Sequence, residues 1–367
     1  MLPNSDLWTK LSETDKKILM YGMGNGADKI LSVCREHNIE IADFFASDGF
    51  VRGHFFHGKR VLSYSEAKEK YGSENMIVLL SFASSLPDVL ENIYKIDSEC
   101  ELYAPDVPVC GDRIFNLDFF ERNRESFEKT ESLFCDELSK QIYRDIISYK
   151  LSGKIRYLKN SHTDFGELYK NLLRAENFEY IADLGAYNGD TLREIKNFAP
   201  NLKEAYAFEP DARSFRKLTQ YAKDEPSLKV NAYQLAAWSG KDTLVFDGSG
   251  NRNSSLVSGP SIEVSKQAKQ VEVQADSLDS ILDGRPIDYI KYDVEGSERE
   301  AISGSLETIE RYSPALLVSL YHRSEDLFDL PLLIKSHFPN YSFYLRRRQY
   351  IPAWDSMLIA VNNKNKA

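Results

Sequence analysis

The stretch YIADLGAYNGDT, residues 180–191, decides how the fold of the whole chain is interpreted. An apolar run that contains Asp183 is followed by a turn with Gly185 and Gly189, and then by an amphipathic stretch. This order is typical of a strand, a tight turn and a helix that open a βαβ unit. Glycine lets the backbone turn sharply and come close to a ligand. In an open α/β sheet, ligands bind at this carboxyl end of the strands.

A second acidic residue follows the next predicted strand. In AYAFEP (205–210), Glu209 ends the strand, 20 residues after Gly189. A carboxylate at this position accepts hydrogen bonds from both hydroxyls of a ribose. The turn lacks the GxGxxG spacing that fits a pyrophosphate, so the two motifs together favour S-adenosylmethionine. The alternative is a structural glycine turn beside a surface glutamate.

The second half of the chain predicts a mostly parallel sheet of seven strands. The last two strands are separated by a short loop and should pair antiparallel, because a parallel pair needs a long crossover. A side hairpin, 243–246 with 271–273, encloses a loop rich in Gly, Ser and Asn. This pattern fits the Rossmann-like sheet of class I methyltransferases. The predicted strands are 180–184, 205–208, 230–235, 287–292, 315–321, 342–345 and 357–361.

The chain divides into three predicted parts. Residues 1–110 form a small Rossmann-like α/β domain, 111–173 a helical linker or cap, and 174–367 the methyltransferase-like domain. The first domain has its own turn, in which Gly22, Gly24 and Ala27 fit GxGxx[G/A], and Asp48 follows the next strand. This spacing indicates a site for NAD or a nucleotide sugar. About four strands are predicted there, too few for a complete dinucleotide fold, so acceptor binding or dimer contacts are the alternative.

Composition limits the class of protein. The 367 residues are 42 % apolar and 28 % charged, which is ordinary for globular proteins. No apolar run approaches the ~20 residues of a membrane helix, and no secretory signal is recognised. Four scattered cysteines argue against a disulfide framework. We therefore expect a cytoplasmic protein. The net charge of −10 argues against nucleic acid as a partner, and the helical middle offers a surface for a homodimer.

The last half of the chain resembles the FkbM-type methyltransferase family. The resemblance is carried by DLGAYNGD (183–190), AFEP (207–210), LAAWSG (235–240), DSLD (276–279), IKYDVEGSE (290–298) and PALLVSLYHRSEDL (314–327). It implies S-adenosylmethionine-dependent O-methylation of a sugar, glycan or natural-product hydroxyl. By position, the methionine part of the cofactor is assigned to the glycine turn, the ribose to Glu209 and the adenine to the segment after the third strand. The residues so assigned are Asp183, Gly185, Ala186, Tyr187, Asn188, Gly189, Asp190, Thr191, Glu209, Pro210, Ala236 and Ala237.

Methylation of a hydroxyl requires a base that removes its proton as attack proceeds. Asp293 and Glu295 follow the fourth core strand, and His322 follows the fifth. We expect His322 to be the base, because imidazole titrates near neutrality. Asp293 would orient His322 or hold the acceptor hydroxyl, and Lys291 would pair with one of the two carboxylates. Many family members place an acid where this chain has Leu-Tyr-His (320–322), so the base is not fixed by the resemblance.

Acceptor contacts are predicted from Ser254 and Ser255 in the polar loop and from Arg346 at the end of the sixth strand. Nothing in the sequence requires a metal, although Asp293 with Glu295 could hold Mg²⁺. Two other functions stay open at this point. One is an NAD- or nucleotide-sugar-binding oxidoreductase or epimerase that uses the first domain, and the other is a non-catalytic cofactor-binding subunit.

Overall fold

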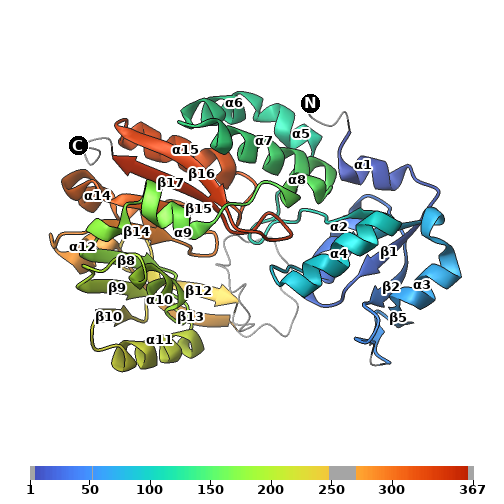
Figure 1. Cartoon of the computed structure of the whole chain (residues 1–367), viewed down its shortest axis with the longest axis horizontal. Helices are drawn as coiled ribbons and strands as arrows, with labels where there is room; N and C mark the ends of the chain where they lie inside the picture. The colour runs from blue at the N-terminus through green and yellow to red at the C-terminus, as the bar shows by residue number, and fades with distance from the viewer. Residues whose placement is uncertain (1–4, 52, 248–269, 363–367) are drawn as a thin grey trace.

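The computed structural model describes residues 5–51, 53–247 and 270–362. It contains two α/β units with a group of helices beside them (Figure 1). The first unit follows helix α1 (Leu7–Ser12) and contains a sheet in the order β5-β2-β1-β6-β7. All pairings in this sheet are parallel. Its strands are β1 (Lys17–Tyr21), β2 (Ile41–Ala46), β5 (Leu62–Ser63), β6 (Met76–Leu80) and β7 (Glu101–Tyr103).

Three helices accompany the first sheet, and two further strands form a separate pair. The helices are α2 (Asn25–Glu36), α3 (Tyr64–Tyr71) and α4 (Pro87–Glu99), and the paired strands are β3 (Phe55–Phe56) and β4 (Lys59–Arg60). The first sheet thus has five strands, one more than the sequence predicts. β5 and β7 contain only two and three residues, too few for a periodic apolar signal.

Helices occupy the middle of the chain and pack against the C-terminal sheet (Figure 1). They are α5 (Leu117–Arg122), α6 (Arg124–Leu133), α7 (Glu137–Ser152), α8 (Arg156–Lys159) and α9 (Phe165–Glu167). The Ser139 hydroxyl at the start of α7 accepts a hydrogen bond of 2.9 Å from the backbone of Leu345. The buried Tyr143 hydroxyl donates to the carbonyl of Leu327. These contacts attach the helical segment to the second unit.

The C-terminal sheet has the order β10-β9-β8-β14-β15-β17-β16. Its first five strands are parallel, and β17 runs antiparallel to both of its neighbours. The seven predicted strands and the antiparallel end are therefore confirmed. The strands are β8 (Tyr180–Leu184), β9 (Glu204–Phe208), β10 (Lys229–Tyr233), β14 (Tyr289–Tyr292), β15 (Ala315–Ser319), β16 (Tyr341–Arg347) and β17 (Ser356–Asn362).

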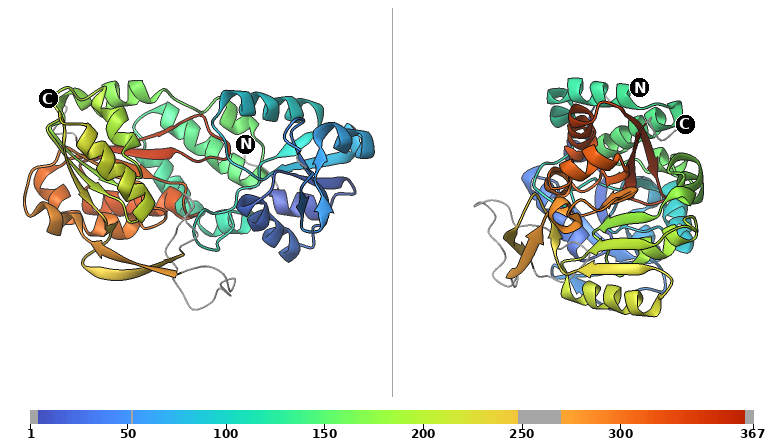
Figure 2. Two further views of the ribbon diagram at one scale, coloured as in Figure 1. Left: turned by 90° about the horizontal axis from the view of Figure 1, so that it is seen from below. Right: turned by 90° about the vertical axis from the view of Figure 1, so that its left-hand side faces the viewer.

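The remaining elements complete this unit. The helices are α10 (Asp190–Lys196), α11 (Ala212–Asp224), α12 (Leu278–Leu282), α13 (Glu298–Ser303), α14 (Leu306–Tyr312) and α15 (Asp326–His337). The side hairpin is also present: β12 (Asp242–Asp247) pairs antiparallel with β13 (Gln270–Asp276), and β11 (Ala236–Ala237) pairs with β13. Both views of Figure 2 show this hairpin projecting from the domain. Ser254 and Ser255, predicted to bind the acceptor, lie outside the described residues.

Candidate active site

A cavity of about 1830 Å³ lies at the carboxyl ends of the core strands of the second unit. Many of the residues predicted from the sequence line it together. They are Gly185, Tyr187, Asp190, Thr191, Glu209, Pro210, Ala236, Ala237, Lys291, Asp293 and Glu295. Asp183, Ala186, Asn188, Gly189, His322 and Arg346 are not part of this lining. The strand topology therefore gathers residues more than 100 positions apart at one place, as the sequence motifs predict.

Contacts with the backbone of neighbouring strand ends fix the glycine turn after β8. Gly185 has a φ of +87°, and a Cβ at this position would lie 1.9 Å from the carbonyl oxygen of Asp293. Only glycine fits such an approach of two backbones. The amides of Gly185 and Ala186 both donate to the carbonyl of Phe208, at 3.0 and 2.8 Å. These contacts fix the turn against the ends of β9 and β14, which carry the acidic residues of the site.

Glu209 is held at the end of β9 by backbone amides. Its Oε2 accepts a hydrogen bond of 2.8 Å from the amide of Tyr187, and its Oε1 accepts one of 2.8 Å from the amide of Asp211. Burial raises the pKa of Glu209 to about 7, although the two amide bonds act in the opposite direction. Each carboxylate oxygen has a further lone pair, so a ligand in the cavity can still donate to it.

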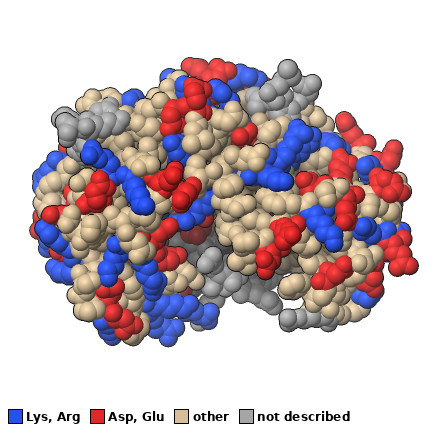
Figure 3. All heavy atoms as spheres, in the orientation of Figure 1, with Lys and Arg blue, Asp and Glu red and all other residues tan. Residues whose placement is uncertain are grey.

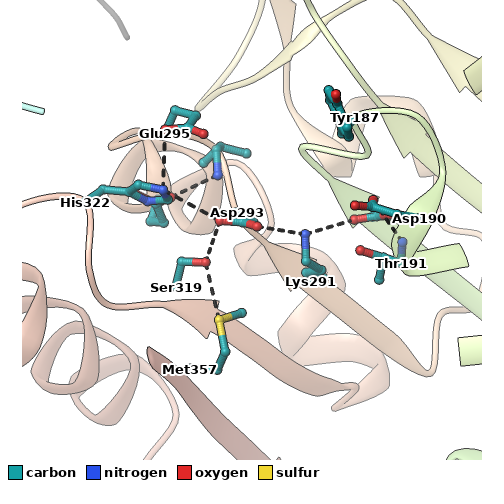
Figure 4. A network of polar contacts seen from close by, with 12 residues as sticks. Tyr187, Asp190, Thr191, Lys291, Asp293, Glu295, Ser319, His322 and Met357 are labelled. Atoms are coloured by element: carbon teal, nitrogen blue, oxygen red, sulfur yellow. Dashed lines mark hydrogen bonds and ion pairs between the residues drawn. The ribbon is translucent and has the colours of Figure 1, made fainter. Parts of the chain in front are cut away.

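Asp183 is fully buried beside the turn, and neither of its oxygens has a hydrogen-bond partner among the described residues. Burial raises its pKa to about 7, against the attraction of Lys291. The Nζ atom of Lys291 lies 3.1 Å from Asp293 (Figure 4). It also lies 3.5 Å from Asp183. Burial acts to lower the pKa of Lys291, but the carboxylates of Asp293 and Asp183 together act more strongly in the opposite direction. The net shift is upward, so the ammonium keeps its charge.

The Asp293 carboxylate accepts three side-chain hydrogen bonds. The donors are the Ser319 hydroxyl at 2.7 Å, the Tyr321 hydroxyl at 2.9 Å and the Lys291 ammonium at 3.1 Å. Burial acts to raise the pKa of Asp293, but Lys291 and His322 lower it to about 2. Asp293 is thus ionised at every physiological pH. A carboxylate with so low a pKa is a poor proton acceptor.

The surroundings of His322 do not fit the role of general base that the sequence predicts for it. The ring is completely buried, with Nδ1 2.8 Å from Glu298 and Nε2 3.5 Å from Glu295 and 3.6 Å from Asp293. Burial lowers the pKa of His322, but the three carboxylates outweigh burial and raise it to about 10. The imidazole is therefore protonated at neutral pH and has no free lone pair. It does not fit the predicted role of general base, because the sequence argument assumed an ordinary imidazole pKa.

Glu295 has the properties that a general base needs, namely access to the cavity and a pKa near neutrality. About a third of its side chain is exposed (34 %), and it lines the cavity. Burial raises its pKa to about 7, and His322 limits this rise. Its φ of +53° is unusual for a residue other than glycine. Glu295 is thus a carboxyl group that changes charge near neutral pH at the edge of the cavity, beside a fixed imidazolium (Figure 4).

Aromatic side chains that the sequence motifs do not predict form a wall of the cavity next to Asp293. Tyr321, Tyr350 and Trp354 line the cavity together with Asp355. The Trp354 ring centroid lies 6.5 Å from that of Tyr321 and 5.7 Å from that of Tyr350. The signal in the sequence was the pair of aromatics in YIPAWD (350–355), between the last two predicted strands.

Arg346 lies elsewhere than predicted. Its guanidinium is bonded to Asp136, at 2.7 Å, and to the hydroxyl of Ser139, at 2.8 Å, both at the start of α7. Arg348 lines the cavity instead, with its guanidinium 4.0 Å from the centre of the Phe165 ring and bonded to both oxygens of Glu194. Arg346 therefore secures the helical segment and is not placed to contact an acceptor in the cavity.

Basic side chains gather at one rim of the cavity. Arg213, Arg216 and Lys217 of α11 line it, and Figure 3 shows Lys and Arg side chains grouped at the lower left, where Figure 1 places this helix. The chain as a whole carries a net charge of −10. This local excess of cations favours an anionic group of a small ligand at that rim.

The loop after β6 packs against part of the glycine turn of the first unit, whereas a Cβ on Gly24 would meet nothing within 4 Å. A Cβ on Gly22 would lie 2.7 Å from the Ser81 hydroxyl, and one on Gly26 would lie 2.1 Å from the Ser81 carbonyl oxygen. The carboxylate of Asp48 accepts bonds from the Ser65 amide at 3.0 Å and the Ser65 hydroxyl at 2.7 Å. Gly22 and Gly26 thus make room for the loop after β6, and Asp48 supports the start of α3.

Two other classes of feature are absent from the described part of the chain. Residues 5–51, 53–247 and 270–362 contain no group of three or more His, Cys, Asp or Glu side chains arranged to hold a metal ion. Within these same ranges, no helix combines the length and the apolar character needed to cross a membrane.

The chain is similar to one family model and to several solved structures. Residues 183–355 match the family model of the methyltransferase FkbM domain. The crystal structure of methyltransferase FkbM from Methylobacillus flagellatus KT is similar over 98 % of this chain and 94 % of its own, with a TM-score of 0.72 and 18 % identity. An rRNA methylase from Streptococcus thermophilus is similar over 55 % of this chain and 96 % of its own, with a TM-score of 0.35 and 12 % identity. The curated proteins contain no match. The family match confirms the resemblance that the motifs indicate, and the first structure shares the fold of the whole chain.

Proposed function

Because residues 183–355 form a methyltransferase FkbM domain, we propose that this methyltransferase moves the methyl group of S-adenosylmethionine to a hydroxyl of a sugar, glycan or natural product. One observation carries the proposal. Glu209 is a buried carboxyl group that lines the cavity after β9, and Asp183 is a buried carboxyl group in the adjacent strand β8, behind the lining. Glu209 has free acceptor capacity, and Asp183 has no hydrogen-bond partner among the described residues.

These residues fit the chemical groups of S-adenosylmethionine. Glu209 would accept hydrogen bonds from the ribose hydroxyls, since two backbone amides already orient its carboxylate. Ala236 and Ala237 would border the adenine. A buried carboxyl without a hydrogen bond is costly. The Lys291 ammonium, 3.5 Å away, offsets part of that cost at Asp183, and the cationic groups of the cofactor would offset more of it. When bound, S-adenosylmethionine supplies an electrophilic methyl group on a sulfonium.

We assign the base to Glu295. A proton acceptor is most effective when its pKa lies near the working pH, and the pKa of Glu295 is about 7. In this role its carboxylate would take the proton of the acceptor hydroxyl while that oxygen bonds to the methyl carbon and the bond from this carbon to the sulfonium sulfur breaks. His322 is a positioning residue, because its imidazolium lies between Glu295 and Asp293. Lys291 balances the charge of Asp183 and Asp293.

The acceptor side of the cavity supports a hydroxyl-rich ring. Tyr321, Tyr350 and Trp354 offer flat apolar faces, and binding sites of this kind combine aromatic walls with a few polar groups. Asp355 contributes a half-buried carboxylate to the same wall. Carboxylates accept hydrogen bonds from hydroxyl groups. A sugar ring carries both the apolar face and the hydroxyls that these four side chains would recognise.

The test is calorimetric titration of S-adenosylhomocysteine into the full chain, with NAD⁺ as a parallel titrant. We expect one site per chain, and about 10- to 100-fold weaker binding in Glu209→Gln, because hydrogen bonds to a charged group contribute ~1.5–3 kcal/mol. Glu204→Gln is the matched control, since Glu204 begins the same strand and bonds to Lys229. Binding of NAD⁺ without S-adenosylhomocysteine, or equal affinities in both variants, would overturn the proposal. Transfer of labelled methyl to a panel of sugars and phenols then identifies the acceptor.

A further inference from the structure

We propose that Lys29, in the first unit, is a positioning residue for Glu295 and acts through the chain segment 108–110. The inference rests on the proposed function, because that function makes Glu295 the base. It gives the first unit a role in the reaction that does not require a nucleotide at its glycine turn.

The first link joins α2 to the segment. The Nζ atom of Lys29 donates to the carbonyl of Pro108 at 3.1 Å and to the carbonyl of Val109 at 2.8 Å. Lys29 lies in the first turns of α2, directly after the glycine turn. Val109 itself lines the catalytic cavity. One ammonium group of the first unit thus holds two consecutive carbonyls at the edge of the active site.

The second link joins the segment to residues 293–298, which contain Glu295 and are called the catalytic loop below. The thiol of Cys110 donates to the carbonyl of Glu295 at 3.0 Å, and the amide of Cys110 donates to the carbonyl of His322 at 2.9 Å. A Cβ on Gly296 would lie 2.9 Å from the Cβ of Cys110. Cys110 is buried, and burial raises the pKa of its thiol to about 12. It therefore stays a neutral donor that holds the loop.

The catalytic loop needs such support because its backbone is strained. Glu295 and Gly296 have φ values of +53° and +90°. A residue other than glycine, here Glu295, persists in this region only where its surroundings fix it. Burial lowers the pKa of Lys29, and Cys110 and Glu295 oppose this only in part, so the net shift is downward.

The experiment compares Lys29→Met with Lys59→Met in the full chain. Lys59 is a matched control, because its ammonium also donates to two carbonyls in the first unit, those of Ile41 at 3.0 Å and Ala42 at 2.6 Å. Amide hydrogen exchange of peptides covering 293–298 reads the loop directly, and steady-state kinetics separate kcat from KM. Cys110→Ala is the second variant. It breaks the link at the thiol and leaves Lys29 in place, so the test does not depend on one substitution folding.

For Lys29→Met we expect faster exchange at 293–298 and a kcat about 10-fold lower, since small displacements of a reacting group are costly. The KM for S-adenosylmethionine should change less than about twofold, and Lys29→Arg should restore both readouts. Cys110→Ala should show the same effects, and Lys59→Met neither. Exchange in Lys29→Met and Cys110→Ala that equals the control would overturn the inference. If the wild-type chain binds no S-adenosylhomocysteine, the proposed function fails, and the exchange comparison still decides whether Lys29 positions the loop.

Discussion

Replacing His322 by glutamine tests whether this side chain is the general base or a positioning residue for Glu295. If His322 were the base, His322→Gln would remove the acidic limb of the pH–rate profile together with the activity. In the structure the imidazolium lowers the pKa of Glu295. We therefore expect His322→Gln to retain an acidic limb that is moved to higher pH, because Glu295 then ionises less readily.

The stability effect has a calculable size. The pKa of His322 rises from 6.5 to about 10 in the folded chain, and each unit corresponds to ~1.4 kcal/mol. A raised histidine pKa stabilises the fold below the unfolded pKa, and this contribution is lost as pH rises toward the folded pKa. The ion cluster should thus contribute at most about 5 kcal/mol at about pH 6 and about 1 kcal/mol at about pH 9.5.

The assay is chemical denaturation of wild type and His322→Gln at both pH values, with His337→Gln as control because His337 is exposed. We expect His322→Gln to lower the free energy of unfolding by about 3–5 kcal/mol at the lower pH, as for other broken buried ion pairs, and by much less at the higher pH. An equal loss at both pH values would refute the charged histidine. So would an acidic limb of the rate profile that does not move.

Two further predictions concern the carboxyl groups. Glu295→Gln should lower kcat about 10²- to 10⁴-fold while the affinity for S-adenosylhomocysteine stays within about threefold, measured by single-turnover rates and calorimetry; near-normal kcat would exclude Glu295 as the base. Because the pKa values of Asp183 and Glu209 are about 7 without ligand, affinity for S-adenosylmethionine should fall as pH drops from about 8 to about 6. The fall should be less steep for S-adenosylhomocysteine, which lacks the sulfonium charge, and equal slopes in the two titrations would contradict the role of these carboxyl groups.

The fold of the second half was predictable because each core strand is a nearly continuous apolar run. Buried parallel strands have this pattern, and the run at 315–319 is buried at every position. The first unit was less predictable, since β5 consists of Leu62 and Ser63 alone. Two residues are too few to show a periodic pattern of apolar side chains. Their place in the sheet is set by pairing with β2.

Much of the cavity lining was predictable from the sequence, and the pKa shifts within it were not. The motifs place Lys291, Asp293 and Glu295 at a strand end, and a parallel sheet brings such ends together. The pKa of His322 depends on its depth and on Glu298, which turns inward from α13 to meet it. The wall around Trp354 depends on how the β16–β17 connection folds back over the cavity. Neither fact is carried by local sequence, because both arise from packing between distant segments.

The contact between Gly185 and the carbonyl of Asp293 has a consequence for how this enzyme can change over time. With 1.9 Å between that oxygen and the place of a Cβ, the turn assigned to the cofactor and the loop assigned to the base behave as one mechanical part. Neither can be remodelled without the other. Trp354 and Asp355 belong to a connection between two strands that is free of this constraint. Substitutions at Trp354 or Asp355 should therefore alter the aromatic wall without displacing the turn or the loop.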